Sequence, residues 1–325
     1  MEKFNKIVVK ELEDGSFSQT IEEMSFDSLP PNDLLIQVKY SSLNFKDALS
    51  ATGNKGVTKK YPHTPGIDAA GIVVKSTSND FKEGDEVIVT GFDLGMNTSG
   101  GFSEYICVPS SWAVFKPSGL SLKECMIFGT AGLTAAMCID KLLRNGLIQG
   151  PLIVSGATGG VGTLALMILD KLGIETMAFS RKESAIDFLK GIGAKDIIHS
   201  FENTERALLK PMFSAAIDTV GGTVLENILK LIKPNGAVSI CGMALSPSLN
   251  TTVFPFILRG LSLFGIDSAE ADLNWRKYLW QKLSTEWKPN HLEAIQKTVE
   301  MKNLSDEIEK MLRGNQMGRI VVKIS

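Results

Sequence analysis

The pattern of apolar and polar positions divides the chain into three regions. From about residue 152 to residue 265, short apolar runs alternate with segments that have apolar residues at helical spacing. The runs that predict strands are Leu152–Ser155, Thr176–Phe179, Asp196–His199, Ala215–Asp218, Ala237–Cys241 and Ser262–Gly265. The helical segments between them are Thr163–Leu172, Ser184–Ile192 and Val224–Leu231. Alternation of this kind predicts a parallel sheet with helices on both faces.

The first 122 residues have a different pattern. Short β-branched runs at Leu34–Tyr40, Gly71–Val74 and Glu86–Val89 are separated by Gly, Pro, Asn and Asp. This spacing predicts a small antiparallel barrel or sandwich. A helical pattern from Leu122 to Leu143 then leads into the alternating region.

The last region predicts two amphipathic helices, Asn274–Thr285 and His291–Lys302, and a final strand, Arg319–Ile324. A terminal strand needs a partner sheet, and chain termini often lie near each other. We therefore expect the final strand to pair with the first, β-rich region, which would make that domain discontinuous.

A glycine-rich turn joins the first strand of the alternating region to its helix. Its sequence is Gly-Ala-Thr-Gly-Gly-Val-Gly at residues 156–162. Gly156 allows a tight bend, Gly159 allows the backbone to approach a pyrophosphate, and Gly162 allows the helix to pack on the strand. The helix N-terminus adds unpaired N–H groups and partial positive charge. With a strand before it and a helix after it, this turn predicts a dinucleotide-binding site.

The end of the next strand indicates which dinucleotide. Sites for NAD usually have an Asp or Glu there, which binds the ribose hydroxyls. This chain has Ser180, Arg181 and Lys182 instead. A hydroxyl and two cations suit a 2′-phosphate, which a carboxylate would repel. We therefore predict NADP(H), the alternative being a solvated basic turn.

Composition narrows the class of protein. The 325 residues are enough for two domains, and 44% hydrophobic and 22% charged residues are typical of a globular protein. A net charge of −2 gives no reason to expect nucleic acid or an anionic membrane as partner. No uncharged apolar run reaches the ~18 residues of a membrane span, and the N-terminus has no secretory pattern. We expect a cytoplasmic enzyme acting on a small-molecule substrate.

The cysteines and histidines give no reason to expect a metal. Cys107, Cys125, Cys138 and Cys241 form no C-x-x-C pair and have mostly apolar neighbours, which favours buried, reduced thiols. Only three histidines are available as imidazole ligands. We therefore expect no metal site.

Together these motifs resemble the medium-chain dehydrogenase/reductase superfamily along essentially the whole chain. The residues that carry the resemblance are Ser41–Asp47, Pro65–Gly71, Gly129–Ala135, the glycine turn and Ala216–Gly222. Ser42–Ala48 and Phe256–Gly260 are most similar to the zinc-independent quinone oxidoreductase and acrylyl-CoA reductase group. Zinc-dependent relatives have Gly-His-Glu where this chain has Gly66-Ile67-Asp68, and a cysteine ligand near Asn44.

The resemblance implies an α/β fold with two domains, an active site between them and, commonly, a homodimer. A GroES-like β-rich catalytic domain would span residues 1–122, completed by 258–325, and a doubly wound parallel-sheet Rossmann domain that binds NADP(H) would span 123–257. The resemblance also implies the cofactor contacts. The pyrophosphate would lie at Thr158, Gly159, Gly160 and Val161, and the 2′-phosphate at Ser180, Arg181 and Lys182. The nicotinamide end would lie near Leu245, Ile266, Ser268 and Asn315.

Three residues are candidates for catalysis. Asn44 could donate a hydrogen bond to substrate or nicotinamide, or could instead cap the turn after its strand. Asp47 could act there too, or could cap a helix. Tyr61 precedes a proline and matches only loosely the tyrosine donor of some enoyl reductases, and His63 could relay a proton. No residue stands out as the general acid.

The function we predict is NADPH-dependent hydride transfer, without zinc, to an activated C=C bond such as that of acrylyl-CoA or a related enoyl thioester or enone. Hydride adds to the β-carbon, charge develops on the carbonyl oxygen, and the protein must position the reactants and stabilise that charge. An NADPH:quinone oxidoreductase is the alternative on the same scaffold. A non-catalytic NADPH-binding sensor or structural protein is an alternative of another class.

Overall fold

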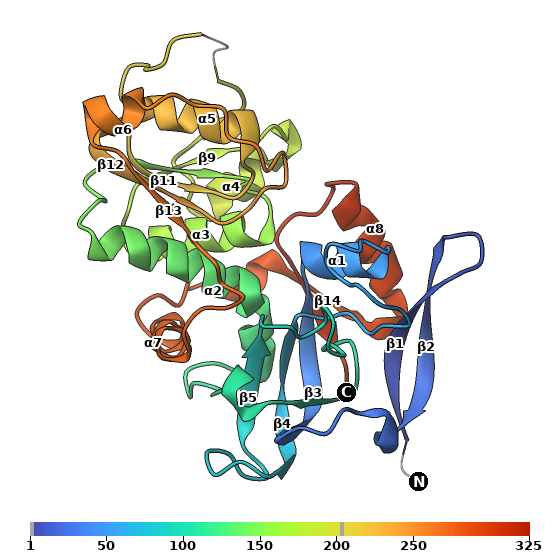
Figure 1. Cartoon of the computed structure of the whole chain (residues 1–325). Coiled ribbons are helices and arrows are strands. Elements are labelled where there is room, and N and C mark those ends of the chain that lie inside the picture. The colour runs from blue at the N-terminus through green and yellow to red at the C-terminus, as the bar shows by residue number, and fades with distance from the viewer. Residues whose placement is uncertain (1–2, 202–204) are drawn as a thin grey trace. The chain divides into compact units, whose positions relative to one another are not determined.

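The computed structural model describes residues 3–201 and 205–325, which form two compact units (Figure 1). The first unit contains the residues up to Thr130 together with Ala269–Thr285 and His291–Ser325. The second unit contains Ala131–Ser268 and Glu286–Asn290. The chain therefore first passes from one unit to the other within a single helix, α2 (Leu122–Arg144).

The second unit is built on a six-stranded parallel sheet with the order β10-β9-β8-β11-β12-β13. Its strands are β8 (Leu152–Ser155), β9 (Thr176–Phe179), β10 (Asp196–Ile198), β11 (Phe213–Asp218), β12 (Ile232–Ile240) and β13 (Ser262–Gly265). The chain runs outward from β8 through β9 and β10, then crosses to the other side of β8 for the remaining strands. The direction of winding thus reverses between β8 and β11, where open α/β sheets bind their ligands.

Helices cover both faces of this sheet, as the alternating pattern predicts. They are α3 (Gly160–Lys171), α4 (Ile186–Gly191), α5 (Gly222–Leu231) and α6 (Phe254–Arg259). Figure 1 shows α2 and α3 on one side of the sheet and α5 and α6 on the other. Apolar side chains of the strands and of α5, among them Phe213, Val238 and Ile228, are fully buried between these layers. The predicted doubly wound sheet is confirmed.

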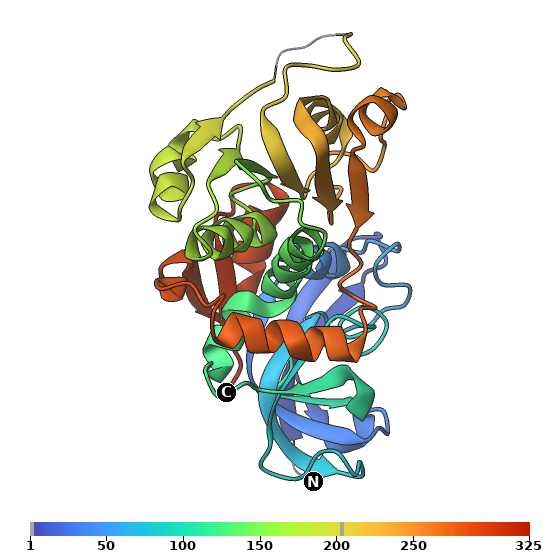
Figure 2. The ribbon, with the colours of Figure 1, turned by 90° about the vertical axis from the view of Figure 1, so that its left-hand side faces the viewer.

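The first unit is rich in strands. Its seven-stranded sheet has the order β14-β15-β3-β4-β5-β7, with β6 also paired to β3, and a separate hairpin is formed by β1 and β2. The strands are β1 (Lys3–Glu11), β2 (Phe17–Ser25), β3 (Leu34–Leu43), β4 (Asp68–Ser76), β5 (Glu86–Thr90), β6 (Tyr105–Val108), β7 (Ala113–Phe115), β14 (Gln296–Glu300) and β15 (Arg319–Lys323). The helices are α1 (Phe45–Ala51), α7 (Leu273–Ser284) and α8 (Leu304–Leu312), and α7 packs beside β7 (Figure 2).

The end of the chain confirms two predictions and corrects a third. Strand β15 pairs antiparallel with β3, and α7 forms where a helix is predicted. The helix predicted at His291–Lys302 is wrong, because that segment forms a short 3-10 turn followed by strand β14. Strand β14 pairs in parallel with β15 along five residues. A partner distant in sequence therefore overrides the local helical pattern.

Helix α2 is a core helix with a break in it. By length and mean hydropathy, 1.4 over 18 residues, it could cross a membrane, but 83% of that window is buried inside the protein. Its apolar surface is therefore already covered. Gly129 interrupts the helix with φ 51° and ψ −155°, a conformation that glycine adopts readily and other residues rarely do.

Candidate functional site

The turn between β8 and α3 depends on glycine at two positions. Gly156 has φ +59°, and a Cβ there would lie 2.1 Å from Thr219 Oγ1. A Cβ at Gly162 would lie 2.4 Å from the carbonyl oxygen of Gly156. Both distances are far below van der Waals contact. The bend at Gly156 and the close packing of helix on turn at Gly162 therefore have the geometry that the sequence pattern indicates.

The start of α3 presents backbone donors. Gly159 is the N-cap residue, and no side chain caps the helix there. The first-turn N–H groups of Gly160, Val161 and Gly162 have no acceptor within the helix, since only the fourth N–H reaches back to the cap carbonyl. These groups and the helix dipole favour an anion at this place.

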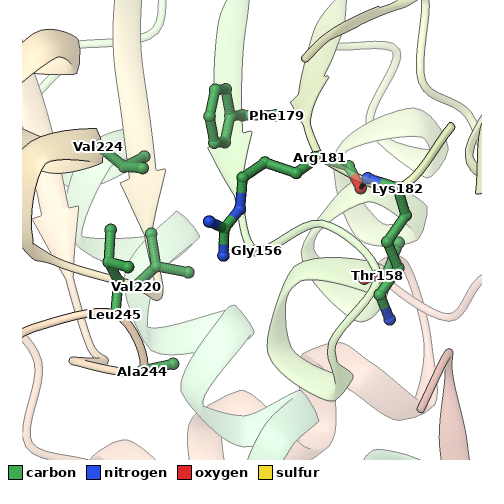
Figure 3. A pocket seen from close by; sticks show the side chains of 10 residues that line it. Gly156, Thr158, Phe179, Arg181, Lys182, Val220, Val224, Ala244 and Leu245 are labelled. Atoms are coloured by element: carbon green, nitrogen blue, oxygen red, sulfur yellow. Dashed lines mark hydrogen bonds between the residues drawn. The ribbon is translucent and has the colours of Figure 1, made fainter. Parts of the chain in front are cut away.

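A pocket of about 480 Å³ opens beside this turn (Figure 3). Its residues come from the carboxyl ends of β8, β9 and β11, from α5 and from the loop after β12. They are Gly156, Thr158, Phe179, Ser180, Arg181, Lys182, Val220, Val224, Ala244 and Leu245. The pocket thus lies at the point where the winding of the sheet reverses, the usual ligand site of this architecture.

One side of the pocket is basic and the other is apolar. Arg181 is exposed, and its side chain extends into the pocket in Figure 3. Burial lowers the pKa of Lys182, whose backbone N–H donates to Ser180 Oγ over 3.2 Å. Val220, Val224 and Leu245 supply the apolar wall. A ligand with an apolar ring system and anionic groups fits such a lining.

Asp218 fixes the carboxyl ends of two central strands of the sheet, beneath the pocket. Its carboxylate is fully buried and accepts hydrogen bonds from Ser155 Oγ over 2.6 Å and from the Gly221 N–H over 2.7 Å. Ser155 Oγ in turn accepts from the Thr219 N–H over 3.0 Å. Burial raises the pKa of Asp218. The ends of β8 and β11 are therefore tied together where the glycine turn begins.

The structure brings some of the predicted cofactor residues together and not others. The pocket contains Thr158, Ser180, Arg181, Lys182 and Leu245, and Gly159, Gly160 and Val161 lie at the adjoining helix start. Ile266 and Ser268 follow β13, and the Ile266 N–H donates to the carbonyl of Ile240. Asn315 belongs to the first unit, between α8 and β15.

The first unit contains a second polar cluster, which we call the Asp68 network: Ser42, Asn44, Asp47, Asp68, Thr130 and Arg319. The Asp68 carboxylate accepts from Ser42 Oγ over 2.6 Å, from Thr130 Oγ1 over 2.6 Å and from Asn44 Nδ2 over 2.8 Å. Arg319 is 3% exposed and donates to Ser42 Oγ, to Asn44 Oδ1 and to the Ile127 carbonyl. Burial lowers the pKa of Arg319, and the nearby carboxylates of Asp68 and Asp47 act to raise it.

The break at Gly129 makes room for the Asp68 network. A Cβ at Gly129 would lie 2.5 Å from Asp68 Oδ2, 2.7 Å from Ser42 Oγ and 2.9 Å from Arg319 Nη2. The Thr130 N–H, freed by the break in α2, donates to both oxygens of Asp68 over 3.0 Å. The kink in α2 is thus part of the polar cluster.

Two of the predicted catalytic residues lie in this network. The half-buried Asn44 amide donates to Asp68 and accepts from Arg319, so both of its ends are hydrogen-bonded. Asp47 is fully buried and accepts from the backbone N–H groups of Asn44, Gly66 and Ile67. Asp47 thereby holds the loop before β4 against the start of α1.

The third predicted catalytic residue lies elsewhere in the same unit. The Tyr61 hydroxyl donates to the carbonyl of Ser50 over 2.7 Å, and its ring packs edge-on against Phe17. Burial raises the pKa of Tyr61. His63 is buried with Nε2 2.9 Å from the Gly95 carbonyl, and burial lowers its pKa.

Sequence reasoning did not identify Asp68 and Arg319 as members of one buried cluster. Arg319 begins a strand whose next three residues are buried and apolar, and Asp68 begins a strand whose next three residues are buried Ala69, Ala70 and Gly71. A charged residue inside a buried strand needs a partner, so each position carried a usable signal. That the two face the same cluster is visible only in the folded chain, because they lie 251 positions apart in the sequence (319 − 68).

No metal cluster is found in the part of the chain that the structure describes. Within residues 3–201 and 205–325, no three His, Cys, Asp or Glu side chains lie close enough together to hold a metal ion. At the positions of the Gly-His-Glu motif, the buried Ile67 side chain replaces the imidazole and Asp68 is bonded within its network.

Comparison with known proteins supports this architecture. Residues 30–118 match the family model of the alcohol dehydrogenase GroES-like domain, and residues 160–285 match that of the zinc-binding dehydrogenase. The chain is 40% identical over 310 residues to YhfP of Bacillus subtilis, which is named as a quinone oxidoreductase, with 94% of each chain covered. It is 35% identical to the acrylyl-CoA reductase AcuI of Ruegeria pomeroyi, with 99% of each chain covered.

Solved structures agree with the sequence relatives. The yhdH oxidoreductase of Salmonella enterica, in complex with NADP, superposes with a TM-score of 0.96 at 36% identity, covering 99% of this chain and 100% of that one. YhfP with NAD bound also has a TM-score of 0.96, at 38% identity, over 99% of this chain and 100% of that one. The predicted fold class, a GroES-like domain with a Rossmann domain, is confirmed.

The raised pKa of Asp47 predicts a specific pH dependence of stability. Burial and the nearby Asp68 carboxylate raise the pKa of Asp47 to about 7. The folded protein therefore holds this proton more tightly than the unfolded chain, and the stabilisation is lost as pH rises from about 4 to 7. The Asp47→Asn variant lacks this titration. The difference in free energy of unfolding between the wild type and the variant should therefore grow as pH falls from 7 to 4, by roughly 4 kcal/mol at most.

Urea unfolding of the wild type and the variant at several pH values measures this difference. Asp80→Asn, at an exposed aspartate, is the control for losing one carboxyl group. A destabilisation by Asp47→Asn that stays constant or shrinks toward pH 4 would contradict the prediction.

Proposed function

The chain belongs to the medium-chain dehydrogenase/reductase superfamily, in the group of quinone oxidoreductases and acrylyl-CoA reductases, and from this membership we propose that it is an NADPH-dependent reductase. The proposed reaction is hydride transfer to an activated C=C bond, with acrylyl-CoA or a related enoyl thioester or enone as substrate. The observation that carries the proposal is the pocket at the switch point of the sheet, with Arg181 and Lys182 along one side.

The residues of this pocket fit NADP(H). The glycine turn leaves no room for side chains at Gly156 and Gly162, and the adjoining start of α3 offers N–H groups to a pyrophosphate. Ser180, Arg181 and Lys182 would hold the 2′-phosphate through hydrogen bonds to charged groups. The residues that line the pocket include no carboxylate. Sites that prefer NAD usually have one, which binds the ribose hydroxyls.

When bound, the nicotinamide supplies the hydride, and the protein supplies orientation and electrostatics. We propose that Leu245, Ile266 and Ser268 lie near the nicotinamide end, as family resemblance implies. Ser268 Oγ accepts a 2.6 Å hydrogen bond from Thr134 Oγ1, which would hold it in one position. Asn315 is proposed for the nicotinamide end on the family resemblance alone.

The substrate needs a donor for its carbonyl oxygen and a proton for its α-carbon. Asn44 is our candidate donor. Its amide already donates to Asp68 and to the Ser42 carbonyl, so it would exchange one of these bonds for the substrate oxygen. Asp47 would position the turn that carries Asn44 through its bonds to the Asn44 N–H and to the loop before β4. Tyr61, bonded to Ser50, is a weaker candidate on this geometry.

A quinone oxidoreductase is the second candidate function. The similarity to YhfP, named as a quinone oxidoreductase and 40% identical, favours it. A quinone would carry the developing charge on oxygen atoms that solvent can protonate, so the site would need no protein acid. The two candidates share the cofactor pocket and differ in the electron acceptor.

The basic residues of the pocket predict selective loss of NADPH affinity on substitution. Arg181→Ala should raise the Kd for NADPH about 10- to 100-fold, because one hydrogen bond between charged groups is lost. The Kd for NADH should change less than about twofold, since NADH has no 2′-phosphate. Isothermal titration calorimetry with both cofactors measures the two values.

Lys190→Ala is the matched control, because Lys190 is an exposed cation of the same unit on α4, outside the pocket. It should leave both affinities unchanged. Equal weakening of NADPH and NADH by Arg181→Ala would show that Arg181 does not bind the 2′-phosphate.

The identity of the acceptor is tested by steady-state oxidation of NADPH with acrylyl-CoA, crotonyl-CoA and a small quinone in parallel. We expect kcat/KM for acrylyl-CoA to exceed that for the quinone at least about tenfold. Turnover with the quinone alone would make the second candidate correct. Tight NADPH binding without turnover on any of the three would favour a non-catalytic NADPH-binding protein.

We also propose that the protein is a homodimer formed through α6 and β13. Four apolar side chains on and beside α6 are strongly exposed: Val253 (63%), Phe254 (49%), Ile257 (72%) and Leu258 (63%). The chain continues from α6 directly into β13, the edge strand of the sheet. An apolar patch beside an open strand edge favours burial against another protein, and a second copy brings the same two features.

Analytical ultracentrifugation tests the dimer. The wild type should sediment at twice the chain mass of 35.3 kDa, and Ile257→Asp should shift it to the monomer. Ile21→Asp, at an exposed apolar residue of the β1–β2 hairpin, should leave the mass unchanged. A monomeric wild type would rule out the proposal.

The four cysteines are free thiols, the state expected in a reducing compartment. We therefore propose that the protein works in the cytoplasm, and fractionation of cells that express the natural protein would test this.

A further inference from the structure

Two cysteines that lie 103 positions apart in the sequence (241 − 138) meet beside the candidate cofactor pocket. Cys138 is on α2, and Cys241 directly follows β12. The interaction with the Cys241 side chain raises the pKa of Cys138. The Cys241 thiol also lies 3.6 Å from the Asp218 carbonyl oxygen.

A second observation places the same two segments together. Ser239 Oγ donates a 3.2 Å hydrogen bond to the carbonyl oxygen of Cys138. Side chains two residues apart in an extended strand point to the same face, so Cys241 faces α2 as Ser239 does. The Cys241 N–H donates to the backbone carbonyl oxygen of Asp218 over 3.0 Å, which continues the pairing of β11 with β12. The contact between the cysteines is thus set by the sheet and helix.

We propose that Cys138 and Cys241 are an oxidation site at which a hydroperoxide forms a reversible disulfide within the chain. Cys241 is half-buried and is the thiol that an oxidant reaches, whereas Cys138 is completely buried. The Cys241 sulfur attacks the O–O bond of hydrogen peroxide, which gives a sulfenic acid and one water. The Cys138 sulfur then attacks the sulfenic sulfur and gives its proton to the departing hydroxyl, so the S–S bond forms as the S–O bond breaks and a second water leaves.

The environment of Cys138 keeps this thiol from reacting first. Its interaction with Cys241 and its burial raise the pKa of Cys138 well above the usual range, so it remains protonated and resists direct oxidation. Oxidation of Cys241 places an electrophilic sulfur against this thiol. The pair therefore has one thiol that reacts first and one that resolves the product.

The disulfide would act on the proposed NADPH site, and this part rests on the proposed function. Cys241 begins the loop that carries Ala244 and Leu245 into the pocket wall. The loop is tightly packed, since a Cβ at Gly242 would lie 2.1 Å from the Thr219 carbonyl oxygen. An S–S bond of about 2.05 Å is shorter than any non-bonded contact of two thiols, so its formation pulls this loop toward α2. We expect weaker NADPH binding as a result.

The test uses the purified full-length protein, treated with hydrogen peroxide after removal of reductant. Peptide mapping without reduction should find residues 124–141 linked to the peptide with Cys241, with the loss of two hydrogens. Fragmentation must place the link at Cys138, because Cys125 lies in the same tryptic peptide. Free thiols should fall from four to two per chain, and dithiothreitol should restore them.

Cys138→Ser and Cys241→Ser should each abolish the link. Cys107→Ser is the matched control, because Cys107 is half-buried and belongs to the other unit, and it should leave the link intact. Oxidation confined to single cysteines, or a link between chains, would overturn the proposal.

The effect on the cofactor is measured separately. The Kd for NADPH of the peroxide-treated wild type should rise about tenfold and return with dithiothreitol, while treated Cys241→Ser should not change. If the disulfide forms but the NADPH affinity does not change, the proposed effect on the pocket is wrong, while the proposed oxidation site is retained. A reduced wild type that binds no NADPH would instead refute the proposed function.

Discussion

The candidate cofactor site depends on one buried carboxylate. Asp218 is removed from water completely, and an unpaired charge in that position would cost several kcal/mol. Its bonds to Ser155 Oγ and to the Gly221 N–H compensate for this, and both partners lie at the point where the winding of the sheet reverses. The same bonds fix the ends of β8 and β11, so the glycine turn begins from a rigid edge. A site that must hold a flexible dinucleotide gains affinity from such a rigid frame.

The first unit also contains buried charged groups whose hydrogen bonds are satisfied, with a larger set of partners. Asp68 and Arg319 are both buried, and hydroxyl, amide and backbone groups complete their hydrogen bonds. The glycine at 129 admits this cluster, because any side chain there would overlap it. Asn44 is held between the two charges. In both units, therefore, satisfied buried charge fixes the loops that carry the candidate functional residues.

Much of this architecture could be predicted from the sequence, because its signals are local. The glycine turn, the strands on either side of it and the basic end of β9 are each encoded within a few residues. The cluster around Asp68 and the contact of Cys138 with Cys241 could not be predicted, since distant segments create them. The wrong helix at His291–Lys302 has the same cause, because pairing with β15 decides the conformation of β14. Local patterns predict long, strongly periodic helices and strands well. For a short segment that could form either, pairing with another segment decides the conformation.

The central claim is that this chain holds NADPH at the switch point of its parallel sheet. A crystal structure of the protein with NADPH tests it most directly. The account predicts the pyrophosphate at the N-terminus of α3 and the 2′-phosphate within hydrogen-bonding distance of Arg181 or Lys182. A cofactor whose 2′-phosphate points into solvent, or one bound away from the glycine turn, would contradict it.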